Sequence, residues 1–268
     1  MYKKTIKKKI MLIKYEVVNN KFSTNLLNIS NLLTILKIYS ILWNEVLLCE
    51  TQGDGKMNKY DVLKRIEDKG IVAVVRANNP EEAIKISDAC LKGGVDSIEI
   101  TFTIPGAENV IRELIDKFPE ELLVGAGTVL DSETARIAIL AGAKFIVSPG
   151  FDFETAKLCN RYRVPYMAGC VTINEMIKAL EAGVDVIKLF PGSAFGAGYV
   201  KSVKAPLPQA PIMPTGGVDI NNVDQWIKNG CIAVGVGGKL TAGAKTGDFE
   251  SITKLSKEFI EKIKEARK

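Results

Sequence analysis

The chain has 268 residues, of which 47% are hydrophobic and 25% are charged, as expected for a globular protein with one large core. It contains no histidine, which excludes a Ser-His-Asp triad, a histidine general base and a histidine-ligated metal site. The five cysteines are scattered and form no C-x-x-C pair. We therefore expect reduced, mostly buried thiols in a cytoplasmic protein, with neither a zinc site nor a disulfide framework.

The first 56 residues differ in composition from the rest of the chain. They contain nine lysines and four acidic residues, a net charge of +5, and no alanine, proline or arginine. Residues 57–268 hold 27 basic and 27 acidic residues, so this part has no charge bias toward nucleic acid or a membrane. The shift predicts a boundary, with a single domain over 57–268.

Three explanations compete for residues 1–56. A targeting segment fits poorly, because the apolar run after the first lysines is short and no small-residue cleavage site follows. A membrane anchor over 32–48 would carry Lys37, Asn44 and Glu45 at mid-span, and a surface amphipathic helix is a weaker version of this idea. Third, codons for residues 52–57 can include a ribosome-binding sequence shortly before an ATG. We expect a disordered extension or translated upstream DNA, with Met57 as the true start.

From Tyr60 onward, short apolar runs rich in β-branched residues alternate with helical patterns. The apolar runs predict eight strands, over 71–76, 97–102, 123–128, 145–148, 166–169, 186–190, 212–215 and 233–237. Helices are predicted over 80–91, 107–118, 131–140, 153–162, 172–180, 195–201, 221–228 and 248–266. Asn79 before Pro80, and Glu175 three residues after Thr172, are typical helix starts.

A weak internal repeat supports one architecture for these elements. Several helices end in a glycine that is followed by the next strand, namely Gly94, Gly142, Gly183 and Gly230. Eight equal strand–helix units predict an α/β fold of the (β/α)8 TIM-barrel type. An open doubly wound sheet is disfavoured, since no G-x-G-x-x-G opens the first helix.

Lys188 stands between Ile187 and Leu189 in the sixth predicted strand. A lysine in an isolated strand is more often an edge residue whose ammonium reaches water. A closed barrel has no edges, so this lysine faces either the lumen or the helix layer. A position in the lumen would remove water from the amine and favour its attack on a carbonyl.

Other polar groups and glycines also stand at predicted strand ends, where TIM barrels carry their functional groups. Glu99 either pairs with Lys188 or Arg76 or moves protons during carbonyl chemistry. The glycine pairs after strands seven and eight form either tight turns or a phosphate site. The strand-end groups are Arg76, Glu99, Thr101, Thr103, Gly127, Thr128, Ser148, Pro149, Lys188, Thr215, Gly216, Gly217, Gly235, Gly237 and Gly238.

Six motifs together resemble the bifunctional KDPG/KHG aldolases, which act on 2-keto-3-deoxy-6-phosphogluconate and 4-hydroxy-2-oxoglutarate. They are EITFT at 99–103, GAGT at 125–128, VSP at 147–149, IKLFP at 187–191, PTGGV at 214–218 and VGVG at 234–237. The resemblance extends over essentially all of 57–268. It implies a metal-independent and cofactor-free class I aldolase, with Lys188 forming the Schiff base and Glu99 as general acid and base.

The resemblance also implies the remaining site residues and a homotrimer in the cytoplasm. Substrate contacts would come from Arg76, Thr103, Thr128, Pro149, Phe190 and Thr215, and phosphate contacts from Gly216, Gly217, Gly237 and Gly238. Some family members carry arginine in place of Thr103. Many carry serine in place of Gly238, so Lys239 is an alternative source of positive charge here. The expected partners are keto-acid and sugar-phosphate substrates, with no nucleic acid and no membrane.

Three other functions remain as alternatives. A phosphogalactonate aldolase would differ only in the hydroxyl stereochemistry that it reads. A metal-dependent sugar-phosphate epimerase would need the histidine ligands that this chain lacks. A non-catalytic sugar-phosphate-binding barrel would have little use for a buried amine beside a carboxylate.

Overall fold

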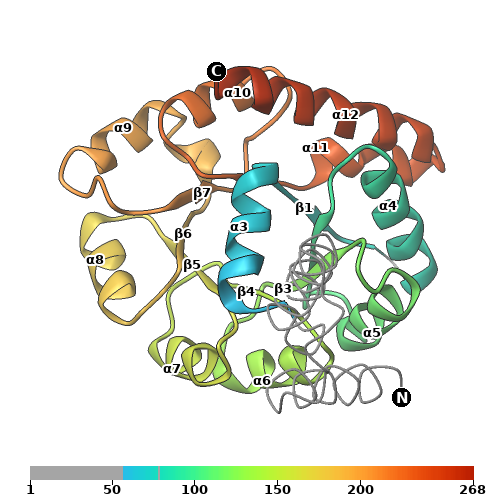
Figure 1. Cartoon of the computed structure of the whole chain (residues 1–268), viewed down its shortest axis with the longest axis horizontal. Coiled ribbons are helices and arrows are strands. Elements are labelled where there is room, and N and C mark those ends of the chain that lie inside the picture. The colour runs from blue at the N-terminus through green and yellow to red at the C-terminus, as the bar shows by residue number, and fades with distance from the viewer. Residues whose placement is uncertain (1–56, 78) are drawn as a thin grey trace, which may run out of the picture. The chain divides into compact units, whose positions relative to one another are not determined.

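The computed structural model describes residues 57–77 and 79–268 (Figure 1). The predicted extension over 1–56, including the choice among its three explanations, lies outside these residues, and so does Cys49. Across the described ranges, no helix has both the length and the apolar character needed to cross a bilayer.

Eight parallel strands form the barrel that the sequence predicts (Figure 1). They are β1 (Ile71–Val75), β2 (Ser97–Thr101), β3 (Leu123–Gly127), β4 (Ile146–Val147), β5 (Tyr166–Cys170), β6 (Val186–Leu189), β7 (Ile212–Pro214) and β8 (Val234–Val236). Strands β1 to β7 pair in chain order, and β8 pairs with β1. A bridge between Thr215 and Gly235 joins the ends of β7 and β8 and nearly closes the barrel. The predicted (β/α)8 fold is therefore confirmed.

Helices cover the outside of the sheet (Figure 1). They are α4 (Pro80–Lys92), α5 (Ala107–Lys117), α6 (Ser132–Leu140), α7 (Phe153–Tyr162), α8 (Ile173–Glu181), α9 (Gly198–Lys204), α10 (Val223–Lys228) and α12 (Phe249–Ala266). Their starts follow the predicted caps. Asn79 accepts a hydrogen bond from the Glu82 N–H at 2.8 Å, and Thr172 and Glu175 form the expected capping box.

The side chains of each strand alternate between the helix layer and the barrel lumen. On β2, Ile98 and Ile100 join the large apolar cluster beneath the helices, so Glu99 between them faces the lumen. A second apolar cluster fills one end of the lumen and includes Val186. Lys188 follows Val186 by two residues on β6 and therefore points into the same lumen.

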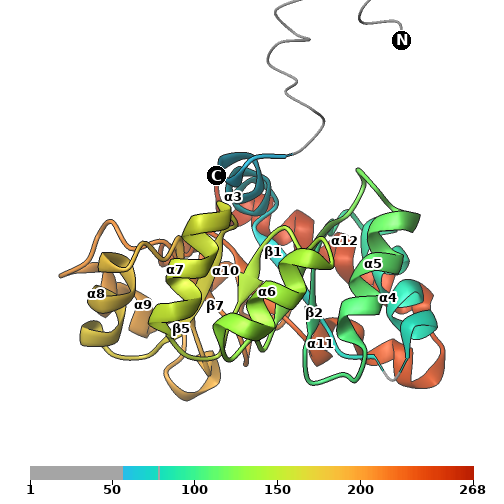
Figure 2. The same cartoon turned by 90° about the horizontal axis from the view of Figure 1, so that it is seen from below.

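The sequence prediction missed a helix that closes the barrel at the end filled by this second apolar cluster. Helix α3 (Lys59–Lys69) lies across that end in both views (Figures 1 and 2). Val62 and Ile66 are almost fully buried in the apolar cluster of the lumen. Lys59 pairs with Asp185 at 2.9 Å, and Arg65 pairs with Asp96 at 3.1 Å. The other faces of this helix are exposed to solvent, so it has few apolar residues. The helical repeat of apolar residues is therefore weak in the sequence.

Two further segments depart from the prediction. The helix predicted over 195–201 is instead a short 3-10 turn, η1 (Gly192–Ala194), followed by α9. Gly196 adopts a φ of 72°, which interrupts a continuous helix. After β8, the short helix α11 (Gly238–Thr241) and the 3-10 segment η2 (Ala242–Thr246) were not predicted.

Candidate active site

Lys188 and Glu99 meet inside the barrel. Their strands, β6 and β2, are separated in the sheet by β3, β4 and β5, so a contact between them crosses the lumen. Lys188 Nζ lies 3.7 Å from Glu99 Oε1, and the two side chains are only 5% and 1% exposed. The lysine is therefore neither an edge residue nor part of the helix layer, and its amine stands beside a carboxylate with little water access.

The carboxylate of Glu99 has an unused acceptor atom. Among the described residues, Oε2 is buried and has no hydrogen-bond partner. A Cβ atom at Gly127, at the end of β3, would overlap this carboxylate. The glycine thus provides the space that Glu99 occupies. A buried carboxylate oxygen is costly without a donor, so a ligand proton is a natural partner.

Thr215 provides a second unpartnered polar atom in the lumen. Its Oγ1 is buried without a hydrogen-bond partner within the described part of the chain. A Cβ at Gly235 on the neighbouring strand β8 would overlap this hydroxyl. Gly127 and Gly235 therefore have the same effect, since each leaves room for a polar side chain. Both glycines were predicted at strand ends, but this role was not predicted.

Phe190 lies between the lysine and the glycine turn after β7. The Lys188 amine is 5.3 Å from the centroid of the Phe190 ring, within range of a cation–π contact. A Cβ at Gly216 would lie 3.8 Å from the same ring. Phe190 therefore touches both parts of the predicted site.

The turn after β7 requires glycine at two successive positions. Gly216 and Gly217 have φ values of 86° and 76°. A Cβ at Gly217 would also lie 2.7 Å from Ser193 Cα. The turn is fixed from both sides, because the Asn222 side-chain amide donates to the Gly217 carbonyl at 2.8 Å and the Gly192 N–H donates to the Thr215 carbonyl at 2.8 Å.

The predicted phosphate contacts after β8 lie beside Arg76. A Cβ at Gly237 would stand 3.1 Å from Arg76 Nη1, so the exposed guanidinium lies next to the end of β8. Gly238 begins α11 and has open space where a Cβ would be. The bridge between Thr215 and Gly235 places this strand end beside the glycine turn after β7.

The remaining predicted residues stand at the same ends of β2, β3 and β4. The exposed Thr103 hydroxyl lies 2.9 Å from that of the buried Thr101. Thr128 adopts a φ of 55°, a backbone conformation that is uncommon for threonine. Pro149 is half-buried, and a Cβ at Gly169 on β5 would overlap its carbonyl oxygen. The structure thus places all twelve predicted residues at the carboxyl-terminal half of the barrel strands or just beyond it.

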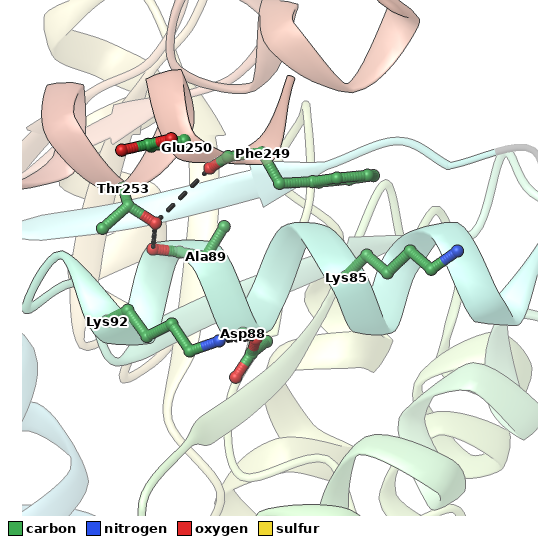
Figure 3. Close-up of a pocket in the computed structure, with 7 residues that line it drawn as sticks. All are labelled: Lys85, Asp88, Ala89, Lys92, Phe249, Glu250 and Thr253. Atoms are coloured by element: carbon green, nitrogen blue, oxygen red, sulfur yellow. Dashed lines mark hydrogen bonds and ion pairs between the residues drawn. The ribbon is translucent and has the colours of Figure 1, made fainter. Parts of the chain in front are cut away.

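A surface pocket of about 650 Å³ lies elsewhere, between α4 and α12 (Figure 3). None of the predicted site residues lines it, and several of its polar groups have partners. Lys92 pairs with Asp88 at 2.6 Å, and the Thr253 hydroxyl donates to the Ala89 carbonyl at 3.0 Å. Its lining residues are Lys85, Asp88, Ala89, Lys92, Phe249, Glu250 and Thr253.

Within residues 57–77 and 79–268, no group of three or more histidine, cysteine or acidic side chains is arranged to hold a metal ion. Cys90, Cys159, Cys170 and Cys231 are buried and unpaired, as predicted. Burial raises the pKa of each of these thiols to about 12.

Comparison with known proteins gives a consistent result. A family model described as KDPG and KHG aldolase matches residues 62–255. The 2-dehydro-3-deoxy-6-phosphogalactonate aldolase of Escherichia coli (strain K12) is 34% identical over 197 residues, 73% of this chain and 95% of that protein. The 2-dehydro-3-deoxy-phosphogluconate aldolase of Treponema pallidum (strain Nichols) is 32% identical over 207 residues, 75% of this chain and 96% of that protein.

One of the solved structures with a similar fold contains a trapped intermediate. The KDPG aldolase of Legionella pneumophila was crystallised with pyruvate captured at low pH as a covalent carbinolamine intermediate. It superposes with a TM-score of 0.69 at 26% identity, and the match covers 75% of this chain and 97% of that chain.

Proposed function

Because this chain belongs to the KDPG and KHG aldolase family, we propose that Lys188 forms the Schiff base of its aldolase reaction and that Glu99 moves the protons. The observation that carries this assignment is the 3.7 Å approach of the two buried side chains across the lumen. The free Oε2 of Glu99 supports it, since a proton shuttle needs an acceptor that the protein has not already used.

In the proposed reaction, the Lys188 amine attacks the C2 carbonyl carbon of the keto acid, and the carbinolamine loses water to give a protonated imine. Glu99 takes the proton of the C4 hydroxyl as the C3–C4 bond breaks. The electron pair of that bond passes toward the imine nitrogen and forms an enamine. The aldehyde formed at C4 leaves, and Glu99 returns its proton to C3. Hydrolysis of the imine then releases pyruvate and regenerates the lysine.

The substrate we favour is 2-dehydro-3-deoxy-6-phosphogluconate, which gives pyruvate and glyceraldehyde 3-phosphate. Cleavage of 4-hydroxy-2-oxoglutarate to pyruvate and glyoxylate is the expected second activity. The keto-acid and hydroxyl contacts are assigned to Arg76, Thr103, Thr128, Pro149, Phe190 and Thr215. The phosphate is assigned to Gly216, Gly217, Gly237 and Gly238, whose backbone approaches a ligand closely without side chains.

The galactonate epimer is a second candidate substrate, because the relative that is 34% identical is named for it. The two 6-phosphorylated substrates differ at one hydroxyl-bearing carbon, so the values of kcat/KM for both decide between them. Turnover of both by the native chain and of neither by Lys188→Met supports the assignment of the lysine. Tight binding of both without turnover by the native chain would instead indicate a non-catalytic barrel.

From the family resemblance we also propose that the protein is a homotrimer and that it is located in the cytoplasm. Exposed apolar side chains on and beside the neighbouring helices α6 and α7 support self-association. They are Leu130, Ile137, Leu140, Phe153 and Tyr162. Light scattering after gel filtration gives the subunit number, and a monomeric mass at micromolar concentration would rule out the trimer.

A further inference from the structure

A hydrogen-bonded chain lies behind the turn that joins β4 to α7, on the side away from the lumen. Ser148 and Tyr166 are 2% and 1% exposed, and their hydroxyl oxygens lie 2.7 Å apart. The Ser148 hydroxyl donates to the Gly150 carbonyl. The Asp152 N–H donates to the Tyr166 oxygen at 3.4 Å. These contacts reach both ends of the short segment 150–152.

The direction of each hydrogen bond follows from the number of protons available. Each hydroxyl has one proton, and both oxygens lie within hydrogen-bond distance of the Gly150 carbonyl, Tyr166 at 3.4 Å and Ser148 closer. We assign the Ser148 proton to that carbonyl because its contact is the shorter one, and the Tyr166 proton to Ser148. The chain therefore runs from the Asp152 N–H through Tyr166 and Ser148 to the Gly150 carbonyl. Burial raises the pKa of Tyr166 to about 12, so the phenol keeps its proton at neutral pH.

The other side of this turn faces the strand beside Lys188. The Pro149 carbonyl oxygen occupies the space that a Cβ of Gly169 would need, and the Gly150 N–H group lies close to it. Gly169 is the register partner of Lys188 in the β5–β6 pair. The Pro149 carbonyl thus lines the lumen beside Lys188, in the place that a side chain at position 169 would take. Because residue 169 is a glycine, no side chain there holds the carbonyl in position.

We propose that Ser148 and Tyr166 are positioning residues that hold Pro149 against Gly169 and so shape the keto-acid site next to Lys188. The proposal rests on the proposed function of Lys188. Neither hydroxyl touches the lumen, so both act through the turn and not on the substrate. Ser148 was predicted as a strand-end group, whereas no role was predicted for Tyr166.

The test uses full-length Tyr166→Phe, Ser148→Ala and the double variant. Each enzyme is incubated with a series of pyruvate concentrations and borohydride, and the rate of covalent trapping is measured. We expect the half-saturating pyruvate concentration to rise by about fivefold in each single variant, the factor equivalent to one hydrogen bond. The trapping rate at saturation should change less than the half-saturating concentration, because Lys188 itself is unaltered.

Tyr199→Phe is the matched control. It removes one phenolic hydrogen bond, here the one to the Val171 backbone carbonyl at 2.7 Å, and leaves the Pro149 turn intact. We expect a comparable loss of melting temperature with an unchanged half-saturating concentration. If Tyr166→Phe lowers only the melting temperature, as this control does, the positioning role is wrong.

The double variant tests whether the two hydroxyls act as one unit. We expect its half-saturating concentration to match that of the single variants and not to multiply their effects. If the two substitutions multiply in their effect on the half-saturating concentration, the two hydroxyls do not act as one hydrogen-bonded unit. If the native enzyme does not trap pyruvate, the proposed function of Lys188 is wrong, and the positioning role of Ser148 and Tyr166 is wrong with it. If the native enzyme traps pyruvate but the variants bind it equally well, only the positioning role is wrong.

Discussion

Lys188 and Glu99 face each other across the lumen from strands that are not neighbours, with 3.7 Å between Nζ and Oε1. No single strand determines this distance. It depends on closure of the barrel, on α3 filling the opposite end, and on Gly127 leaving room for the carboxylate. The pair is therefore a consequence of the whole fold, and its chemistry can be tested one residue at a time.

Replacing Glu99 with glutamine should slow aldol cleavage and leave substrate binding measurable. Glutamine has nearly the same shape but cannot accept and return a proton, and general acid–base catalysis typically contributes a factor of about 10²–10⁴. Steady-state kinetics measures the fall in kcat, and competition with pyruvate measures binding. A variant with native kcat would remove Glu99 from the mechanism.

Gly127→Ala should disturb the same carboxylate from the other side. An added Cβ would overlap Glu99, so either the side chain or strand β3 must move, at a cost of about 1–3 kcal/mol. We expect a clear loss of kcat together with a lower melting temperature. Gly198→Ala is the control, since a Cβ there meets nothing within 4 Å, and it should behave like the native enzyme.

Gly217→Ala should separate phosphorylated from unphosphorylated substrates. If the turn binds phosphate, KM for the 6-phosphorylated substrate should rise by about tenfold or more, the usual effect of losing one hydrogen bond to a charged group. KM for 4-hydroxy-2-oxoglutarate, which has no phosphate, should change little. Equal changes for both substrates would exclude a specific phosphate role for this turn.

The control for that experiment is Gly247→Ala. Gly247 has nearly the same φ, 75°, so alanine suffers a similar backbone penalty, but a Cβ there has open space around it. It should lower the melting temperature without affecting either KM.

The buried thiols predict how stability and reactivity depend on pH. In Cys49→Ser, the thiols of Cys90, Cys159, Cys170 and Cys231 should resist a thiol reagent at pH 8 until the chain is unfolded. Burial raises the pKa of each to about 12, whereas a thiol in the unfolded chain has a pKa of about 8.5. The unfolded chain therefore loses protons that the folded chain keeps, and stability should fall as pH rises from about 9 toward 12.

That decline can be followed by urea unfolding at several pH values. Rapid reaction of all four thiols in the folded protein, or stability that is constant over this range, would contradict their burial.

The sequence predicted the barrel well because its signals are local. Gly94, Gly142, Gly183 and Gly230 end their units, and the apolar runs that follow are the strands that the structure contains. Helix α3 was missed because its stability comes from Val62 and Ile66 packing into the lumen, which is a tertiary contact. The 3-10 segments were missed because three and five residues are too few to show a repeating helical pattern.

The site could be predicted only in part for the same reason. Lys188 and Glu99 are polar residues in apolar strands, which is visible in a sequence. The clearances at Gly127, Gly169 and Gly235 depend on what lies across from each glycine, and no local pattern records that. In the segments of β3 and β8, small residues occur two positions apart on the face that points into the lumen. This spacing is the sequence signal that indicates such clearances.

Borohydride trapping tests directly whether Lys188 carries the covalent intermediate. The native protein is incubated with pyruvate and borohydride in the presence of a chelator, digested, and mapped by mass spectrometry. We predict one reduced pyruvyl group on the peptide that contains Lys188, and none in Lys188→Met. An adduct on another lysine, or no adduct at saturating pyruvate, would contradict the account.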